Sequence, residues 1–459
     1  MSRAPTEKML ERILHEVAAE THVPGIAAAV VFHGVESSAY FGKAAADSRT
    51  RLSQTSRFEV SCLMKLFVSL TAIVLAREGV LGLDTSVADV LPELSTRDGA
   101  KGRITLGHLL SHSSGYHGLD ITDMRVRWGY SWRQFAAHFT QTDQLFEPGA
   151  VFNYEHTEHV VVGEMLRRLT EHSAAQLVLD RILGPLGITP VSTSESKAAV
   201  ATFVANHGYS PRTGHYEPIH VPPLAFFWES SLPDWTMTVA EIARIGVSLL
   251  DERRNQLGTA DASTLVLLAR PFITLPCHAR SDTLAEVLPK SFGAGCAHYG
   301  GGVLGHNGSG AGQTCALRID PDDDLVVAVG VNAWSPRTRD TIVRRVVGLC
   351  RTGEDSQDRM ENSGLSYALN EITNGFALDE VAGRYVGSFL GEAVVRRKDR
   401  ELICEVGSAN RRQSFRIVPE NGERYAVKSD MPVSVAFIST PGQTLPVLSL
   451  GMHAYKRAP

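Results

Sequence analysis

A polar stretch late in the chain divides it into two parts of different character. The segment TGEDSQDRMENSG (352–364) has few large apolar residues, which is typical of a linker. Before it the chain mixes helical and strand-like patterns, whereas after it short β-type runs alternate with turns. We therefore expect a large domain over 1–351, a linker over 352–373, and a small antiparallel β barrel or sandwich over 374–459.

The large part carries strand patterns near both of its ends. Residues 26–32 and 36–42 flank a short turn and predict a β-hairpin. Residues 310–320 and 324–332 predict a second pair of strands. Apolar residues at helical spacing predict three helices, which cover 9–17, 62–78 and 338–351. Because the last helix follows the second strand pair directly, we expect it to close onto the same sheet.

Composition excludes several classes of protein. The 459 residues are 43% hydrophobic and 21% charged, which is ordinary for a globular chain and excludes a disordered one. The formal net charge is −5, so the chain lacks the excess of positive charge that is typical of a nucleic-acid binder. The first twenty residues lack the apolar segment of a secretory signal, and no run approaches the roughly 18 apolar residues that cross a bilayer. We expect a cytoplasmic protein with neither a nucleic acid nor a membrane as partner.

Cys62 is the one cysteine of six that has chemically suggestive neighbours. The six are widely scattered without CxxC or zinc-finger spacing, so in a reducing compartment we expect free thiols. Lys65 follows Cys62 by three residues at the start of a predicted helix, which places both side chains on one face. The cation and the positive end of the helix dipole both favour a thiolate. C-x-x-K is a common spacing, and a buried cysteine beside a surface lysine is the alternative interpretation.

The segments that flank Cys62 and Lys65 favour a functional role for this pair over a chance spacing. Phe58 lies four residues before Cys62, and G-V-L-G-L-D-T-S-V (79–87) follows the helix. Together with Lys65 this stretch resembles the S-x-x-K region of serine β-lactamases, DD-peptidases and related esterases. ITLGHLLSHSSGY (104–116) resembles the I-T-x-x-x-L-L-x-H-x-S-G-L segment of the same family, in which its histidine and serine belong to the scaffold.

The resemblance implies both a fold and a set of site residues. The fold is the β-lactamase/transpeptidase-like α/β (α+β) class: an antiparallel sheet flanked by helices, with an all-helical subdomain. Here a small C-terminal antiparallel β domain would follow it. In EPGAVFNYEHTEH (147–159), Tyr154 stands where the family has the tyrosine of Y-x-N, which implies a general base or proton relay. His156 replaces the asparagine and is expected to donate a hydrogen bond to a substrate carbonyl.

The third family element is K-T-G or H-x-G on a strand that borders the site. His306-Asn307-Gly308 matches H-x-G, and a strand pair follows it. The glycine lets the backbone approach the acyl group, while His306 is expected to orient the leaving group or to bind a carboxylate. By resemblance, the oxyanion hole consists of the backbone N–H groups of Cys62 and Ser309. The implied catalytic set is Cys62, Lys65, Tyr154 and His306, with His156, Asn307 and Gly308 binding substrate.

The departure from the family is that position 62 holds cysteine where a serine is expected. A thiolate attacks thioesters readily, and the thioester that it forms reacts well with amines. We therefore expect an acyltransferase or cyclase that uses Cys62 on an activated (thio)ester in small-molecule metabolism. Two alternatives stay open: a hydrolase of esters, amides or D-amino-acid peptides, and a non-catalytic ligand-binding relative. A shift that makes Ser61 the nucleophile would break the spacing to Phe58.

Neither a cofactor nor a metal is expected. His156-x-x-His159 lacks the HExxH pattern and an adjacent set of carboxylates, and no dinucleotide or P-loop fingerprint occurs. The expected partner is a small-molecule acyl substrate, free or bound to a carrier protein as a thioester.

Overall fold

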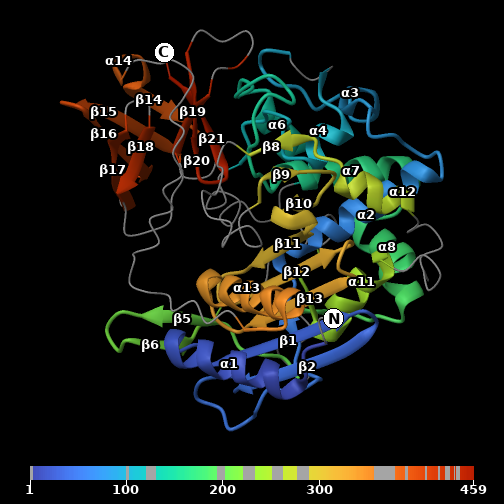
Figure 1. Cartoon of the computed structure of the whole chain (residues 1–459). Helices are drawn as coiled ribbons and strands as arrows, with labels where there is room; N and C mark the ends of the chain where they lie inside the picture. The colour runs from blue at the N-terminus through green and yellow to red at the C-terminus, as the bar shows by residue number, and fades with distance from the viewer. Residues whose placement is uncertain are drawn as a thin grey trace.

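The computed structural model describes most of the chain. The described residues are 4–99, 103–119, 131–193, 202–220, 233–250, 262–275, 289–355, 378–387, 391–408, 411–421, 424–428, 435–438, 440 and 445–458. An antiparallel sheet forms the lower half of the molecule in Figure 1, helices lie above it, and a second sheet lies at the upper left. Among the described residues, no helix combines the length and the apolar character that a membrane crossing requires.

The lower sheet joins strands from opposite ends of the large part. Its eight strands run in the order β2-β1-β13-β12-β11-β10-β9-β8. Their bounds are β1 Gly25–Phe32, β2 Val35–Gly42, β8 Ile273–Thr274, β9 Ser291–Phe292, β10 Ala297–His298, β11 Leu304–Ser309, β12 Thr314–Asp320 and β13 Leu325–Val331. The predicted hairpin is confirmed, and it pairs with β13 so that Ala28 lies opposite Val329. The strand predicted to begin at residue 310 begins at Thr314, because Gly310 and Gln313 close a turn through a 3.0 Å backbone bond.

Both faces of this sheet are covered by helices, which explains why β1 is apolar throughout. Alternate residues of β1, such as Ala28 and Val30, pack with α1 (Glu7–Thr21) and α13 (Pro336–Thr352). The residues between them, such as Ala27, pack with α2 (Met64–Arg77) and α11 (Val239–Leu250) on the other face. The N-terminal and last predicted helices therefore lie together on one face of the sheet, as Figure 1 shows.

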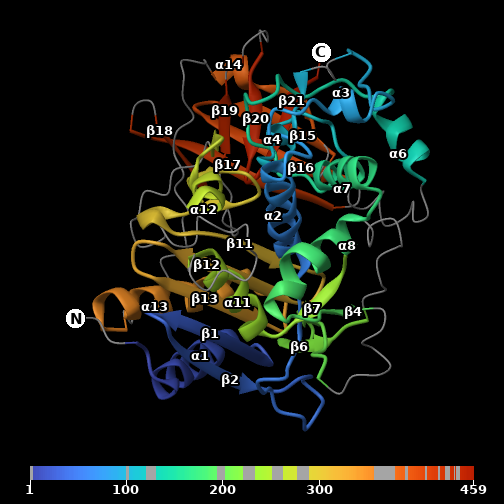
Figure 2. The same cartoon turned by 90° about the vertical axis from the view of Figure 1, so that its right-hand side faces the viewer.

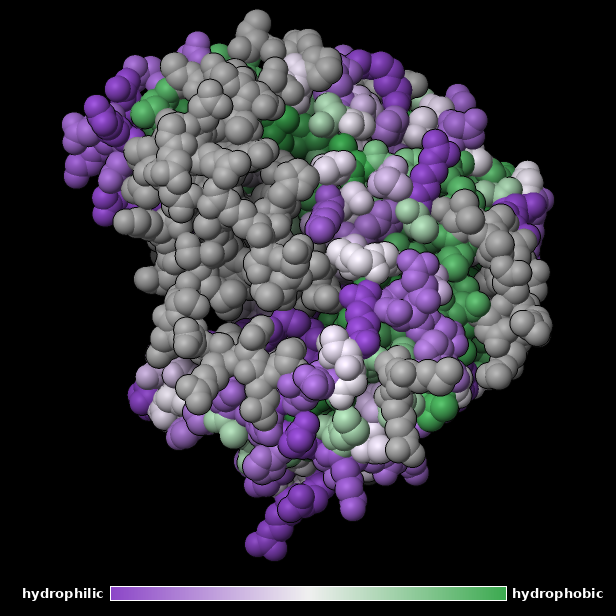
Figure 3. Space-filling model, in the orientation of Figure 1, coloured by the Kyte–Doolittle hydropathy of each residue, from purple (hydrophilic) through white to green (hydrophobic). Residues whose placement is uncertain are grey.

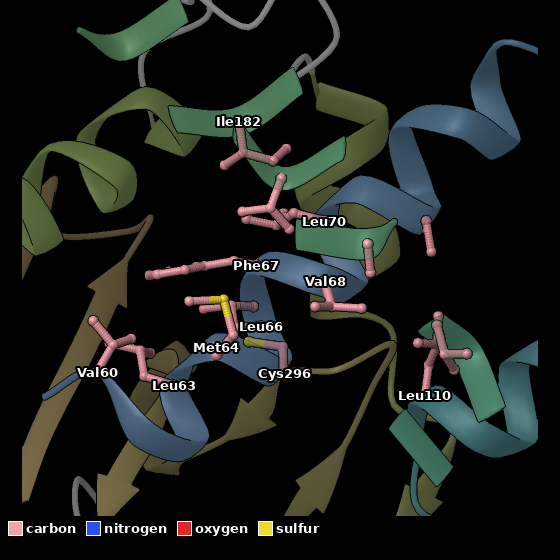
Figure 4. Packing of buried hydrophobic residues seen from close by; sticks show 14 of the residues in the cluster. Val60, Leu63, Met64, Leu66, Phe67, Val68, Leu70, Leu110, Ile182 and Cys296 are labelled. Carbon is pink, nitrogen blue, oxygen red and sulfur yellow. The ribbon is translucent and has the colours of Figure 1, made fainter. Parts of the chain in front are cut away.

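Helix α2 (Met64–Arg77) is the centre of the main core. Every residue from Met64 to Leu75 is buried, including the polar Lys65. Figure 4 shows Phe67, Leu66 and Met64 of this helix packed beside Cys296, and Figure 2 shows α2 upright between the lower sheet and the C-terminal sheet. A helix that is apolar all round must be enclosed by other elements.

The enclosing elements are short helices and small sheets. The helices are α3 Val87–Val90, α4 Leu106–Leu110, α6 Trp132–Phe139, α7 Thr157–Thr170, α8 Ala174–Val178, α11 Val239–Leu250 and α12 Ala262–Ala269. Single turns of tighter or wider helix occur at Ser61–Leu63, Leu179–Leu183, Gly184–Leu186 and Gly300–Gly302. The small sheets consist of β3 Phe58–Glu59, β7 Trp235–Met237 and β4 Val191–Ser192, and of the hairpin β5 His207–Ser210 and β6 His215–Pro218.

The C-terminal part is an eight-stranded antiparallel sheet in the order β18-β17-β16-β15-β14-β21-β20-β19. Its elements are α14 Leu378–Val381, β14 Gly383–Val386, β15 Glu392–Lys398, β16 Glu401–Ser408, β17 Arg411–Asn421, β18 Arg424–Lys428, β19 Val435–Ile438, β20 Val447–Leu450 and β21 His453–Arg457. The edge strands β18 and β19 do not pair with each other among the described residues, so the sheet is a half-barrel. Most of the expected linker, 352–373, lies outside the described residues, and the domain boundaries stay predictions.

The C-terminal sheet packs against the large part through a small apolar cluster. Val447 and Ala454 of the sheet contact Leu145, Phe146 and Val151, which lie just before the segment that contains Tyr154. Burying this cluster excludes water from the contact between the two parts. The β20–β21 turn is thereby held beside the candidate site.

Candidate active site

Cys62 lies in a single helical turn, Ser61–Leu63, that leads directly into α2. Ser61, the residue before it, has a φ of 48°, a left-handed conformation that costs a non-glycine residue roughly 1–3 kcal/mol. The residue before it, Val60, is held by a hydrogen bond of 2.9 Å from its N–H to the Trp235 carbonyl. The cysteine is a free thiol at the start of the helix and is partly exposed.

Lys65 links the C-x-x-K motif to the motif that contains Tyr154 and His156. Its ammonium group is buried and donates to the Tyr154 hydroxyl at 2.8 Å. It also lies 3.1 Å from Nδ1 of His156. Burial and the charge of Lys65 hold the pKa of His156 well below its ordinary value, so this neutral imidazole accepts from the lysine through Nδ1. Its other ring nitrogen is then the one that carries a proton.

The thiol of Cys62 is surrounded by groups that stabilise its anion. Burial by itself raises the pKa of the thiol, but the charge of Lys65 and hydrogen bonds from the Tyr154 hydroxyl and the Ser309 N–H outweigh it. The pKa of Cys62 therefore lies below its ordinary value. Burial also lowers the pKa of Lys65 and raises that of Tyr154 well above its usual range. The tyrosine consequently stays protonated and donates to the sulfur.

Strand β11 brings His306, Asn307, Gly308 and Ser309 past the cysteine. A Cβ atom on Gly308 would lie 2.3 Å from the Val60 carbonyl oxygen, so only glycine permits this approach. The approach places the Ser309 N–H against the Cys62 sulfur. The Asn307 side-chain oxygen is buried without a hydrogen-bond partner among the described residues, and it can therefore accept from a bound molecule.

His306 is neutral and its orientation is fixed. Burial, reinforced by the charge of Lys65, lowers its pKa to about 3. Its Nδ1 lies 2.6 Å from the carbonyl oxygen of Asn307, which can only accept, so the ring proton is on Nδ1. Nε2 is left as an acceptor. An acceptor nitrogen suits the N–H of an amine better than a carboxylate.

A sequence model of the β-lactamase family matches residues 10–349, which is most of the chain. The chain belongs to the β-lactamase family. Penicillin-binding protein 4 of Amycolatopsis lactamdurans is 28% identical to it over 321 residues, 68% of this chain and 82% of that protein. The expected family and fold are thus confirmed.

Solved structures extend the likeness beyond the residues that the family model matches. The crystal structure of SurE is 20% identical and covers 98% of this chain and 99% of its own, with a TM-score of 0.76. A structure of SurE with D-Leu superposes with a TM-score of 0.73. D-amino acid amidase from Ochrobactrum anthropi is 18% identical and covers 75% of this chain and 98% of its own, with a TM-score of 0.61. At these identities the likeness shows the fold, and in SurE it includes the C-terminal sheet.

A buried acid behind Tyr154 was not predicted from the sequence. Glu158 Oε2 lies 2.5 Å from Nδ1 of His112, and Oε1 accepts from the N–H and hydroxyl of Ser114 at 3.2 and 2.6 Å. Burial raises the pKa of Glu158 well above its ordinary value and lowers that of His112 well below. Burial thus favours the uncharged form of both groups, with one proton shared between Oε2 and Nδ1. The His112 and Tyr154 ring centroids are 4.4 Å apart, so this scaffold supports the tyrosine directly.

The C-terminal sheet also reaches the site of this β-lactamase family member, which no sequence motif indicated. The Tyr154 N–H donates to the Met452 carbonyl at 2.8 Å, and the Ala454 N–H donates to the Asn153 side chain at 2.9 Å. Between them, the ring of the partly buried His453 hydrogen-bonds the Tyr154 backbone, and desolvation lowers its pKa to about 3. Strand β21, which carries His453 and Ala454, is one that strand patterning missed.

Proposed function

We propose that the protein is a cysteine acyl-enzyme catalyst that takes an acyl group from an activated thioester and transfers it to an amine. One observation carries the proposal: the Cys62 sulfur accepts hydrogen bonds from the Tyr154 hydroxyl and the Ser309 N–H beside the buried Lys65 ammonium. A structural cysteine needs none of these groups. Family membership supports the coarser conclusion that the chemistry is of the acyl-enzyme type.

The proposed reaction begins with attack of the Cys62 thiolate on the carbonyl carbon of the donor. The N–H groups of Cys62 and Ser309 bind the developing oxyanion. The intermediate collapses, the donor thiolate leaves, and it takes a proton from Lys65 through the Tyr154 hydroxyl. This step leaves an acyl thioester on Cys62 and a neutral lysine.

The second half of the reaction returns that proton. An acceptor amine, held through one N–H by Nε2 of His306, attacks the Cys62 thioester. The amine gives a proton to the neutral Lys65 through Tyr154, the amide bond forms, and the Cys62 thiolate leaves. An intramolecular amine would give a cyclic product by the same steps. Unactivated amides are poor donors, because a thiolate leaves the tetrahedral intermediate more readily than an amine does.

The structural relatives support a proposal for the substrate class. SurE has been solved with D-Leu, and a D-amino acid amidase shares the fold. We propose that the transferred acyl group, or the amine that receives it, is a D-configured amino-acid residue. A hydrolase that passes the same acyl group to water is the second candidate, favoured by the amidase among these relatives.

The test is intact-protein mass spectrometry with N-acetylcysteamine thioesters of D-leucyl and L-leucyl peptides. We expect the wild type to gain the mass of the acyl group, Cys62→Ala to gain none, and the D-thioester to react faster. Chasing the acyl-enzyme with an amine in water then separates transfer from hydrolysis by the ratio of amide to acid. A folded wild type that gains no acyl mass from either thioester would refute the proposal.

A further inference from the structure

Two aromatic side chains of the described residues are more than half exposed. Tyr209 on β5 is 59% exposed and Trp334, just before α13, is 54% exposed. Tyr216 on β6 lies beside Tyr209, with ring centroids 5.6 Å apart at an interplanar angle of 70°. In Figure 3 the lower part of the molecule is mostly hydrophilic in colour. We call Tyr209, Tyr216 and Trp334 the aromatic patch; such an exposed group is typical of an interface.

The aromatic patch is bonded to the segment that carries the Ser309 N–H. The Trp334 N–H donates to the His207 carbonyl at 3.3 Å, and the His207 N–H donates to the Gly312 carbonyl at 3.0 Å. Gly312 belongs to the turn that directly follows Ser309. In Figure 1 the β5–β6 hairpin projects on the same side of the molecule as the C-terminal sheet.

A second chain of contacts ties the same hairpin to the other side of the nucleophile. Asn206, at the foot of β5, donates to the Glu59 side chain at 2.8 Å. The Glu59 N–H donates to Gln313 at 2.9 Å, and Gln313 in turn donates to the Val204 carbonyl at 2.9 Å. Glu59 lies three residues before Cys62. The aromatic patch therefore stands on a rigid frame that adjoins the reacting sulfur.

The hairpin, the loop 43–51 and the start of α13 carry an excess of exposed cations, although the whole chain is negative with a formal charge of −5. The loop 43–51 lies against β5, since Ala205 donates to Ala44 at 2.8 Å and Ala46 donates to Nε2 of His207 at 2.9 Å. The exposed cations on this loop, the hairpin and the start of α13 are Lys43, Arg49, Arg51, Arg212 and Arg337. The exposed acids on the same segments are Asp47 and Glu217. The local field therefore favours an acidic partner.

We propose that the aromatic patch and its cationic surround form the docking surface for an acidic carrier protein that delivers the acyl group as a thioester. The inference rests on the proposed function, because a thioester donor held on a flexible arm needs a protein surface next to the nucleophile. Aromatic anchors within a charged rim are the usual make-up of such an interface. A nucleic acid is disfavoured, because the net charge of the chain repels a polyanion.

The experiment compares two donors with the same D-leucyl acyl group. One is an N-acetylcysteamine thioester and the other is a phosphopantetheine carrier domain whose surface is rich in Asp and Glu. The docking variants are Tyr209→Ser with Trp334→Ser, and Arg49→Glu with Arg51→Glu. We expect each pair to lower kcat/KM for the carrier-bound donor by about tenfold or more and to change it less than about twofold for the small thioester. Raising the salt concentration should weaken only the carrier reaction.

Matched controls lie far from the patch. Val35 is 53% exposed at the opposite end of β2 from Lys43, and Arg133 is an exposed cation on α6. Val35→Ser and Arg133→Glu should leave kcat/KM unchanged for both donors.

Three outcomes would overturn a proposal. If the small thioester acylates Cys62 but the docking variants lower kcat/KM equally for the two donors, or for neither, the docking surface is refuted and the proposed function stands. If a single-stranded oligonucleotide binds the patch more tightly than the carrier domain does, the docking proposal fails. If neither donor acylates the wild type, the proposed function itself fails.

Discussion

The backbone N–H of Tyr154 donates a hydrogen bond of 2.8 Å to the carbonyl oxygen of Met452, about three hundred residues further along the chain. The next residue, His453, hydrogen-bonds the same tyrosine backbone with its ring. The tyrosine in turn bonds both Lys65 and Cys62 through its hydroxyl. The C-terminal sheet is therefore part of the frame around the Cys62 thiol.

Replacing His453 should make the thiol less acidic. His453→Ala removes the ring that holds the Tyr154 backbone, so the hydrogen bond from Tyr154 to the sulfur weakens. We expect the pKa of Cys62 to rise, and His453→Asn, which keeps a side-chain donor, to restore most of the change. The measurement is the rate of iodoacetamide alkylation of Cys62 against pH, which needs no substrate. An unchanged midpoint in a folded His453→Ala protein would show that the ring has no part in positioning the tyrosine.

Serine at position 62 should change the product as well as the rate. Cys62→Ser restores the family's usual nucleophile, but the acyl-enzyme becomes an oxygen ester, which reacts with amines more slowly than a thioester. We expect transfer to an amine to fall by about a hundredfold or more, and the ratio of hydrolysis to transfer to rise. Product analysis with amine and water as competing acceptors measures both quantities. If the wild type and Cys62→Ser gave the same ratio of amide to acid, the cysteine would have no role in favouring transfer over hydrolysis.

Gly308 should tolerate no side chain. A Cβ atom there would lie 2.3 Å from the Val60 carbonyl oxygen and 2.4 Å from the Cys315 sulfur, so β11 must move away from Cys62. Gly308→Ala therefore displaces the Ser309 N–H from the position of the oxyanion. We expect acylation to slow by about a hundredfold or more, the usual effect of losing one oxyanion donor. Single-turnover acylation followed by mass spectrometry measures it, and a circular dichroism spectrum like that of the wild type confirms that the variant is folded.

The His112–Glu158 pair predicts a specific dependence of stability on pH. In the folded protein burial raises the pKa of Glu158 and lowers that of His112, so we expect the pair to hold one proton at neutral pH. In the unfolded chain their ordinary pKa values are 4.5 and 6.5, so between these values the pair also holds one proton. Above pH 6.5 the unfolded pair holds none. Stability must then fall as pH rises, by up to about 1.4 kcal/mol per pH unit, until the raised pKa of Glu158 is reached.

Glu158→Gln isolates this effect. The amide keeps an acceptor for Ser114 and supplies a donor to His112, but it binds no proton. We expect the variant to gain stability relative to the wild type as pH rises from 6.5 to 8.5. Urea unfolding at several pH values gives the free energy of unfolding of each protein. A difference between the two proteins that does not vary with pH would mean that Glu158 is ionised in the folded state.

Local sequence patterns were sufficient to predict the elements whose buried side chains recur at regular spacing along the chain. The alternation through 26–42 predicted the β1–β2 hairpin, and the apolar run after Cys62 predicted α2, because each pattern follows directly from which side chains the element must bury. The family motifs also gave Tyr154 and His306-Asn307-Gly308 before any contact between them was known. Strand β21 was missed because GMHAYKR has no clear alternation of apolar and polar residues.

The sequence by itself determined the main elements and the family. The tertiary structure decided which polar residues meet. Glu158 and His453 carry no distinguishing signal in the sequence, and only the packing of α7 and of the β20–β21 turn brings them, with His112, around Tyr154 and Lys65. Their shifted pKa values depend on that burial, whereas the lowered pKa of Cys62 depends on its meeting with Lys65, Tyr154 and the Ser309 N–H. A pKa depends on desolvation and on distances between charges, and chain connectivity alone fixes neither of them.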